Sequence, residues 1–291
     1  MTNFIETVLR YPNYCRQLTC GQDLITVFNC PIEARLMKER FSDLWSHNNY
    51  IFYVVDGRKF WHTAHNTYDL QKGSCVFVQK GASIVEQFLD TGFCVIMFFI
   101  PDSFIYDTLK GKGVKLSKQE EYDSIIHLDA NETLASFFIS MSSYFAKTKD
   151  PDPQLLELKF RELILTIADE PKNSQLNGYF YSLLNDPQIA KLKRIMNDNY
   201  SFNLSLEQYA TLCDRSLSAF KRDFTKAMHV SPGKWLMTKR LEHAKNLITN
   251  TGKSISEIAF ESGFSNPSHF SKAFKERYGA LPTSLRKEAL T

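Results

Sequence analysis

The chain has 291 residues, of which 43% are hydrophobic, and its formal net charge at pH 7 is +3. This length and composition favour two domains, each able to bury a core of its own. The longest apolar run, at 93–100, is far too short to span a bilayer, and the N-terminus lacks the basic start and apolar run of a secretory signal. We therefore expect neither a membrane protein nor a secreted one.

The cysteines indicate the compartment of the protein, and the charge distribution indicates the kind of partner it binds. Six cysteines are scattered without a Cys-x-x-Cys pair, which favours a reducing cytoplasm and gives no sign of a zinc site. Residues 188–291 hold 17 Lys and Arg against nine Asp and Glu, whereas residues 1–187 hold 18 against 23. A basic region joined to an acidic remainder is expected when one domain meets a polyanion, although a basic surface without a partner would show the same excess.

The first half of the chain has the pattern of a β-structure followed by helices. Residues 24–100 are rich in β-formers that Gly, Asn and Asp interrupt, which predicts short strands at the spacing of a barrel or sandwich. The step Asp56-Gly57 between two apolar runs predicts a hairpin. From Asn131, a predicted cap, apolar residues recur at helical spacing over 132–147 and again over 154–168.

The next segment, 171–187, mixes Pro, Gly, Asn and Ser with a short apolar patch. After it every pattern is helical. The sequence therefore predicts a first domain at 1–170, a linker at 171–187 and an all-α domain at 188–291.

The all-α region contains an internal repeat. Residues 205–224 align with 254–274 at an offset of 49 in the first part and 50 in the second. Both copies place two phenylalanines, four residues apart, after a residue that can cap a helix: Ser216, Phe220 and Phe224 in the first copy, and Asn266, Phe270 and Phe274 in the second. Each pair should bury one stripe of its helix and leave the opposite stripe for a partner.

Each copy also has the small residue and the turn residue of a helix-turn-helix. Ala210 and Ala259 let two helices cross closely, and about four residues later Asp214 and Gly263 tolerate the positive φ of a tight turn. Glycine suits that conformation best, and Asp is acceptable. One such pattern is weak, because many helical hairpins share it, but two in register within the basic region are much stronger.

The outward stripes of the two copies carry polar and basic residues. Such helices fit the major groove of DNA, where Arg and Lys donate to guanine O6 and N7 and where Ser and His make less selective contacts. The expected base-facing residues are Ser218, Lys221 and Arg222 in the first copy and Ser268, His269, Ser271 and Lys272 in the second. The alternative is two ordinary solvated helix faces. Because the stripes differ, we expect the two copies to read different bases.

A helix between the copies should start with Ser231 before Pro232, which takes the first helical position, and end at Gly252. A length of about 16–18 residues spans roughly 25 Å, the right order to place two helices in major grooves about 34 Å apart. The expected phosphate contacts are Lys234, Lys239 and Arg240 beside this helix and Lys275 in the second copy.

These residues resemble the DNA-binding domain of AraC/XylS-type bacterial transcription regulators. The match covers the last third of the chain, through "SLSAFKRDF", "SPGKWLMTKRLEHAKNLI" and "ISEIAFESGFSNPSHFSKAFK", and is most similar to the subgroup with activators of type III secretion genes. The resemblance implies a cytoplasmic homodimer that binds double-stranded DNA and contacts RNA polymerase. Because most members of the family are activators, it also implies activation of transcription. Two positions depart from the family pattern. Arg215 replaces an apolar residue, which suggests a less well packed first unit, and Pro267 replaces a side chain that often contacts bases.

The first domain more loosely resembles the cupin-like sensing and dimerisation domains of such regulators. The expected fold is therefore α+β: a cupin-like β-barrel with two following helices, then two helix-turn-helix units joined by a long helix. Cupin enzymes bind a metal through clustered histidines, but His62 and His65 would lie on opposite faces of a strand, so we expect no metal or cofactor.

Control of the first domain stays open between a small molecule and a protein partner. Residues that could line a ligand pocket are Trp45, Tyr50, Tyr53, Trp61 and Phe77, although such aromatics are more often core. The helices at 132–147 and 154–168 could form a dimer interface or simply pack in the core. The alternative function is a cupin-type metal-dependent enzyme with a nucleic-acid-binding domain. The sequence shows no convergent metal ligands and no Gly-x-Ser-x-Gly motif that would favour it.

Overall fold

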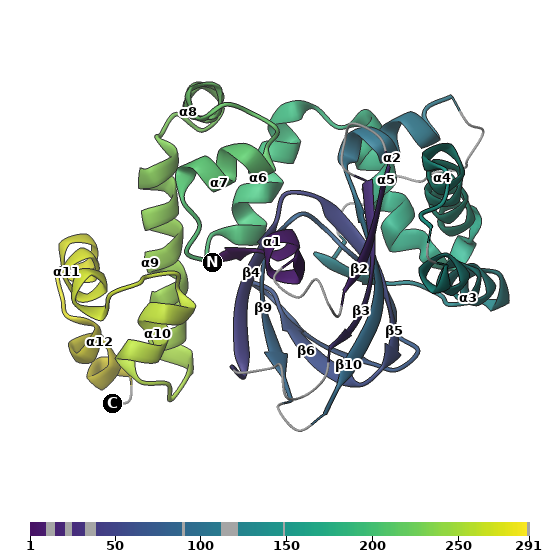
Figure 1. The fold of residues 1–291 in the computed structure, drawn as a ribbon. Coiled ribbons are helices and arrows are strands. Elements are labelled where there is room, and N and C mark those ends of the chain that lie inside the picture. The colour runs from purple at the N-terminus through teal and green to yellow at the C-terminus, as the bar shows by residue number, and fades with distance from the viewer. Residues whose placement is uncertain are drawn as a thin grey trace. The chain divides into compact units, whose positions relative to one another are not determined.

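The computed structural model describes residues 1–9, 15–20, 25–32, 39–88, 91–111, 122–147 and 149–289. These residues form two compact units, Thr2–Pro187 and Gln188–Thr291, and Figure 1 shows their elements. The first unit combines two sheets with helices, and the described residues of the second form helices and no strand, so the predicted α+β class is confirmed. Among all the helices described, none is long and apolar enough to cross a membrane.

The described strands of the first unit form two sheets. One sheet has the order β1-β4-β9-β6-β7, and the other has the order β11-β8-β5-β10-β3-β2. Neighbouring strands are antiparallel except β1 and β4, which are parallel. The bounds are β1 Thr2–Asn3, β2 Arg16–Cys20, β3 Ile25–Ile32, β4 Phe41–Ser46, β5 Asn49–Asp56, β6 Arg58–His62, β7 Thr67–Gln71, β8 Cys75–Val78, β9 Gly81–Gln87, β10 Phe93–Ile100 and β11 Ile125–His127.

Two apolar cores lie on the two faces of the six-stranded sheet. On β5, Tyr50 and Phe52 join the core that also holds Trp61 and Val85 of the other sheet. Ile51, between them in the sequence, joins a second core built with the helices that cover the opposite face. This alternation follows from the two-residue period of a strand, and it explains why β5 is apolar on both faces.

The turn at Asp56-Gly57 is real, but the predicted hairpin is wrong. Gly57 has a φ of +87°, as a tight turn requires, yet β5 pairs with β8 and β10 whereas β6 pairs with β7 and β9. The turn therefore carries the chain from one sheet to the other. A side chain at Gly57 would meet the carbonyl oxygen of Gly92 at 2.3 Å, so the crossing also needs the missing Cβ atom.

Helices cover the outer face of the six-stranded sheet (Figure 1). Their bounds are α2 Asp102–Leu109, α3 Glu132–Ala146, α4 Pro153–Asp169 and α5 Ser174–Asn185, and a short helix α1, Phe4–Leu9, precedes β2. The helices predicted at 132–147 and 154–168 are confirmed as α3 and α4. Asn131 caps α3, since its side chain accepts a hydrogen bond from the Leu134 N–H at 3.0 Å.

Residues 171–187, predicted as a linker, instead contain a 3-10 turn, η2 Pro171–Asn173, and helix α5. Leu176, Phe180 and Leu183 of this helix are buried in the second core. The Pro, Gly, Asn and Ser residues of this segment suggested a linker. The apolar residues between them, however, have the helical spacing of a packed helix. The first unit thus extends to Pro187.

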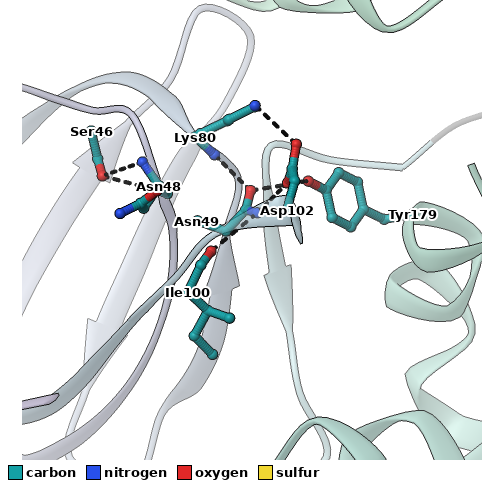
Figure 2. Close-up of polar contacts among 7 residues, drawn as sticks. All are labelled: Ser46, Asn48, Asn49, Lys80, Ile100, Asp102 and Tyr179. Carbon is teal, nitrogen blue, oxygen red and sulfur yellow. Dashed lines mark hydrogen bonds and ion pairs between the residues drawn. The ribbon is translucent and has the colours of Figure 1, made fainter. Parts of the chain in front are cut away.

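A polar cluster fixes α5 to the ends of the strands, as Figure 2 shows. The Asp102 carboxylate accepts hydrogen bonds from Asn49 Nδ2 at 2.6 Å and from the Tyr179 hydroxyl at 3.0 Å, and it pairs with Lys80 Nζ at 2.9 Å. Burial by itself would raise the pKa of Asp102, but the charge of Lys80 and these hydrogen bonds outweigh burial and lower that pKa. The cluster is therefore a charged, satisfied network inside the first unit.

The second unit consists of short and long helices. They are α6 Gln188–Asn199, α7 Leu206–Leu212, α8 Leu217–Met228, α9 Pro232–Asn250, α10 Ile255–Glu261, α11 Pro267–Tyr278 and α12 Pro282–Ala289. The linking helix α9 has 19 residues, slightly more than predicted. It begins with Pro232, whose missing N–H costs nothing at that position.

Candidate nucleic-acid interface

The two predicted helix-turn-helix units are present with matching local structure. Helix α7 packs on α8, and α10 packs on α11. In each unit the first helix starts with a capping box, in which a serine accepts from the third helical N–H and the third side chain accepts from the serine N–H. The serines are Ser205 and Ser254. In the second unit the Ser254 N–H also lowers the pKa of the Glu257 carboxyl that accepts it.

The turn residues have the backbone conformation that their types predicted. Asp214 has a φ of +54° and Gly263 has a φ of +81°. After each turn the expected residue caps the second helix of the unit, α8 or α11. Ser216 Oγ accepts from the Ala219 N–H at 3.3 Å, and Asn266 Oδ1 accepts from the Ser268 N–H at 2.8 Å. The sequence therefore determines both turns locally.

The recognition helices α8 and α11 are each held by their phenylalanines. Phe220, Phe224, Phe270 and Phe274 are all fully buried. The two rings of each pair lie 6.0 Å apart in α8 and 5.5 Å apart in α11. Each helix is thereby locked with the same face inward, which leaves its opposite face to solvent.

The predicted base-facing residues lie on these outward faces. Six of the seven are exposed, and one, Ser271, is half-buried; the exposed six are Ser218, Lys221, Arg222, Ser268, His269 and Lys272. Pro267 is the first residue of α11, as predicted, and shapes the start of that helix. The arrangement presents donors and one imidazole ring along two exposed helix faces.

The position after the turn differs between the units. In the second unit Phe264 is buried and its ring lies 5.1 Å from that of Phe270. In the first unit Arg215 takes that position, and its Nη1 atom pairs with Asp223 Oδ2 of α8 at 2.8 Å. An ion pair thus replaces the apolar contact, and it fixes the Arg215 side chain to helix α8. The sequence could not reveal this partner, which lies eight residues away on the flank of the next helix.

Arg240 does not fit the predicted phosphate contact. Its Nε atom donates to the carbonyl oxygen of Tyr200 at 2.7 Å, and its Nη2 atom donates to that of Phe202 at 2.7 Å. Burial lowers the pKa of this guanidinium, while the neighbouring hydroxyl of Tyr209 opposes the shift. The side chain therefore points into the unit, where it ties α9 to the loop between α6 and α7, and we remove it from the interface.

The other predicted phosphate contacts remain at the surface. Lys234 and Lys275 are exposed. Lys239 is half-buried: its Nζ atom lies 5.7 Å from the centre of the Trp235 ring and 3.9 Å from Glu242 Oε2. Such a long, partly packed side chain can still reach a phosphate with its ammonium group.

The aromatic residues proposed for a ligand pocket do not line one cavity. Tyr50 and Trp61 are buried together between the two sheets, with the Trp61 Nε1 donating to the Tyr50 hydroxyl at 3.3 Å. Phe77 and Tyr53 belong to the core on the other face of the sheet. Tyr50 and Trp61 thus lie in one core, and Phe77 and Tyr53 lie in the other, so these four do not form the predicted pocket. The fifth residue, Trp45, is half-buried.

His62 and His65 occupy the strand β6 and the turn after it. His62 Nε2 lies 3.2 Å from Glu86 Oε2, and its Nδ1 lies 2.9 Å from Thr67 Oγ1. Within the described ranges, no group of three or more His, Cys, Asp or Glu side chains is placed to hold a metal ion.

Comparisons with known proteins match two parts of the chain to family models. Residues 49–179 match the family model described as the ExsA N-terminal regulatory domain, and residues 209–288 match that of a helix-turn-helix domain. The virulence regulon transcriptional activator VirF of Yersinia enterocolitica is 25% identical over 240 residues, covering 81% of this chain and 88% of VirF. The HTH-type transcriptional regulator ExsA of Pseudomonas aeruginosa is 26% identical over 243 residues, covering 81% and 85%.

Among solved structures, that of ToxT from Vibrio cholerae is similar over 89% of this chain and 97% of that protein. The identity is 16% and the TM-score is 0.39.

Proposed function

Because the chain belongs to the AraC/XylS family of transcription regulators, we propose that it binds an asymmetric DNA site with both helix-turn-helix units at once. In this proposal the DNA-binding domain is residues 188–291, and α8 and α11 enter two successive turns of the major groove. The relatives are named as transcription regulators, so the alternative of a cupin-type enzyme has no support.

The observation that carries the proposal is the repetition of one unit on both sides of one unbroken helix. Both recognition helices bury a phenylalanine pair and expose the opposite stripe. The helix α9 has 19 residues, which at 1.5 Å per residue gives about 28 Å. This length is close to the spacing of successive major grooves, about 34 Å, and a helix keeps that spacing constant where a flexible linker would not.

The side chains divide into two roles. We assign base contacts to the seven outward residues of α8 and α11, with Arg222 and Lys272 as the guanine readers. We assign phosphate contacts to Lys234, Lys239 and Lys275, which fix the position of the protein on the duplex without reading sequence. Since α8 carries Lys221 and Arg222 where α11 carries Ser271 and Lys272, the two halves of the site should have different sequences.

Selection from a random library tests this proposal. The full-length protein would be mixed with duplexes that have a randomised centre, and the bound duplexes would be amplified and sequenced over several rounds. We expect two unlike preferred segments about 10 base pairs apart, centre to centre, and a preference over random duplex of about a thousandfold or more. A protein that coats DNA without sequence preference would enrich no segment, and that result would reject the proposal.

The relatives' names also suggest the direction of regulation. VirF is named a transcriptional activator, so we propose that this chain activates transcription from the cytoplasm by contacting RNA polymerase beside its site. Transcription in vitro from a promoter that carries the selected site should rise when the protein is added. A fall would identify a repressor.

The first unit would regulate the second. Residues 49–179 match a domain described as regulatory, and we propose a cupin-like arrangement of its two sheets, controlled by a small molecule or a protein partner. We also propose that it forms the homodimer. Helices α3 and α4 support this, because they expose three apolar side chains: Ile139 at 73%, Leu158 at 62% and Leu155 at 44% exposure.

A further inference from the structure

One acidic residue on the first recognition helix binds two arginines. Asp223 Oδ1 accepts from Arg222 Nε at 3.0 Å, and Asp223 Oδ2 pairs with Arg215 Nη1 at 2.8 Å. The two oxygens of this carboxylate thus serve different guanidinium groups. Arg215 lies just after the turn, so the chain of contacts runs from the turn through Asp223 to Arg222 on the outward face.

The two ion pairs differ in exposure. The side chains of Arg215 and Asp223 are 23% and 19% exposed, whereas that of Arg222 is 73% exposed. An exposed pair between neighbouring residues contributes little by itself. Here, however, the carboxylate is already held by Arg215, so the position of the acceptor for Arg222 is set before DNA arrives. When the helix enters the groove and water leaves, the same pair becomes stronger.

The second unit lacks this arrangement. Phe264 stands at the position of Arg215, and Ala273 stands at that of Asp223. Lys272, which corresponds to Arg222, therefore has no carboxylate beside it at the equivalent position. The device belongs to α8 alone, which makes its effect separable from the contribution of α11.

From this geometry we propose that Asp223 is a positioning residue for base recognition by Arg222, and that Arg215 holds Asp223 in place. The inference rests on the proposed function. With Nε bonded to Asp223, the free edge of the Arg222 guanidinium is its Nη1 and Nη2 pair, which can donate end-on to O6 and N7 of one guanine. The carboxylate also reduces the cost of ordering a long side chain when it binds.

Asp223 could instead act only through its negative charge. Asp223→Asn separates this electrostatic role from the positioning role, because the two roles differ in their effect on base preference. Removing a negative charge next to DNA should tighten binding to every duplex equally and leave base preference unchanged. A positioning role predicts that preference for guanine falls by about fivefold or more at one base pair, while affinity for random duplex stays equal or rises. Base preference at a single position is a readout that a change in overall stability would not move.

The experiment uses the full-length protein and the randomised duplex library. Arg222→Ala identifies the base pair that Arg222 reads, as the position whose preference is lost. Asp223→Asn and Arg215→Gln are then selected on the same library, and we expect both to relax that same position. Glu276→Gln is the matched control, because it makes the same charge change on the exposed face of α11 and its carboxylate pairs with neither arginine.

The outcomes are distinct. If both variants keep the guanine preference that Arg222→Ala loses, the positioning role is rejected while base reading by Arg222 stands. If Arg222→Ala itself leaves the base preference unchanged at every position, base reading by this residue is rejected as well. If the wild-type protein enriches no sequence, the proposed function is rejected. Thermal melting checks that each variant folds, and should Asp223→Asn melt early, the Arg215→Gln selection decides.

Discussion

Gly263 lies against Arg240 so closely that a Cβ atom on the glycine would stand 2.9 Å from the arginine Nε. The same Cβ would lie 2.8 Å from the carbonyl oxygen of Ser201. The turn of the second helix-turn-helix unit therefore packs directly on the linking helix and on the loop that Arg240 holds. The two helix-turn-helix units are joined by these contacts as well as by the continuous helix.

Replacing Gly263 with alanine should therefore destabilise the second unit. The variant needs a positive φ at a residue with a side chain and creates two close contacts, one of them with backbone, so we expect a loss of about 1–3 kcal/mol. Hydrogen exchange measured by mass spectrometry should show faster exchange in peptides from α10 and α11. Gly252→Ala is the control, since, apart from the glycine and its two chain neighbours, no atom of the described residues lies within 4 Å of its Cβ position. Equal exchange in the two variants would contradict the close packing.

Arg240→Met should act through stability rather than through phosphate contact. The methionine keeps the bulk of the side chain but leaves the carbonyl oxygens of Tyr200 and Phe202 without their charged donor, which should cost about 1.5–3 kcal/mol. Chemical denaturation of the full-length protein should show this loss. A variant with unchanged stability and weaker binding to all DNA would return Arg240 to the set of phosphate contacts.

Lys234→Ala should show the opposite behaviour. Lys234 is exposed at the start of α9, so its replacement should leave the denaturation midpoint unchanged. Binding to every duplex should weaken, and the slope of log affinity against log salt should become shallower by about one. Measuring Kd over a series of salt concentrations for selected and random duplexes tests this. A change confined to the selected duplex would indicate a base contact instead.

Asp102→Asn should destabilise the first unit at neutral pH by about 3–5 kcal/mol, because it leaves the largely buried Lys80 without this carboxylate. Since folding lowers the pKa of Asp102, its contribution is present above the unfolded value, about 3.9, and is lost as pH falls through the folded pKa. The difference between the wild type and the variant should therefore shrink as the pH falls below about 4.

Denaturation curves recorded at several pH values measure that difference. The control is Asp107→Asn, on the same helix but with an exposed side chain, which should change the free energy of unfolding little. A constant difference between wild type and Asp102→Asn down to acid pH would show that the ionised carboxylate is not what holds the cluster together.

Leu158→Glu combined with Ile139→Glu should separate the proposed homodimer. Both side chains are exposed apolar groups on α3 and α4, and burying two carboxylates in an interface is strongly unfavourable. Analytical ultracentrifugation should then report a monomer where the wild type sediments as a dimer. Phe260→Glu, at an exposed apolar residue of the DNA-binding domain, serves as the control and should remain dimeric. A dimeric double variant would exclude this face.

The local features of the DNA-binding domain could be predicted from sequence alone. Capping by Ser216 and Asn266, the positive φ at Asp214 and Gly263, and burial of the phenylalanine pairs depend on neighbouring residues and on helical periodicity. The strand-rich first domain and the helices α3 and α4 were predictable for the same reason. In each case the information lies within a few residues of chain.

Three predictions from the sequence were wrong because they depended on residues far away in the chain. The Asp56-Gly57 turn joins two sheets, residues 171–187 join the first unit's core, and Arg240 points inward; each outcome depends on a partner far away in the chain. The division of the aromatic set between two cores has a local cause instead: Tyr50 and Tyr53 are three residues apart on β5, so the two-residue period of a strand places them on opposite faces.

The sequence by itself determined that this chain carries two helix-turn-helix units with unlike outward faces, because periodicity, caps and turn residues act locally. Only the tertiary structure decided which basic side chains are free to meet DNA. Arg240 is held by the carbonyl oxygens of Tyr200 and Phe202, some forty residues earlier in the chain, and Arg222 is bonded to an Asp223 that Arg215 holds. A charged side chain goes wherever its hydrogen bonds can be satisfied, and those partners are set by packing.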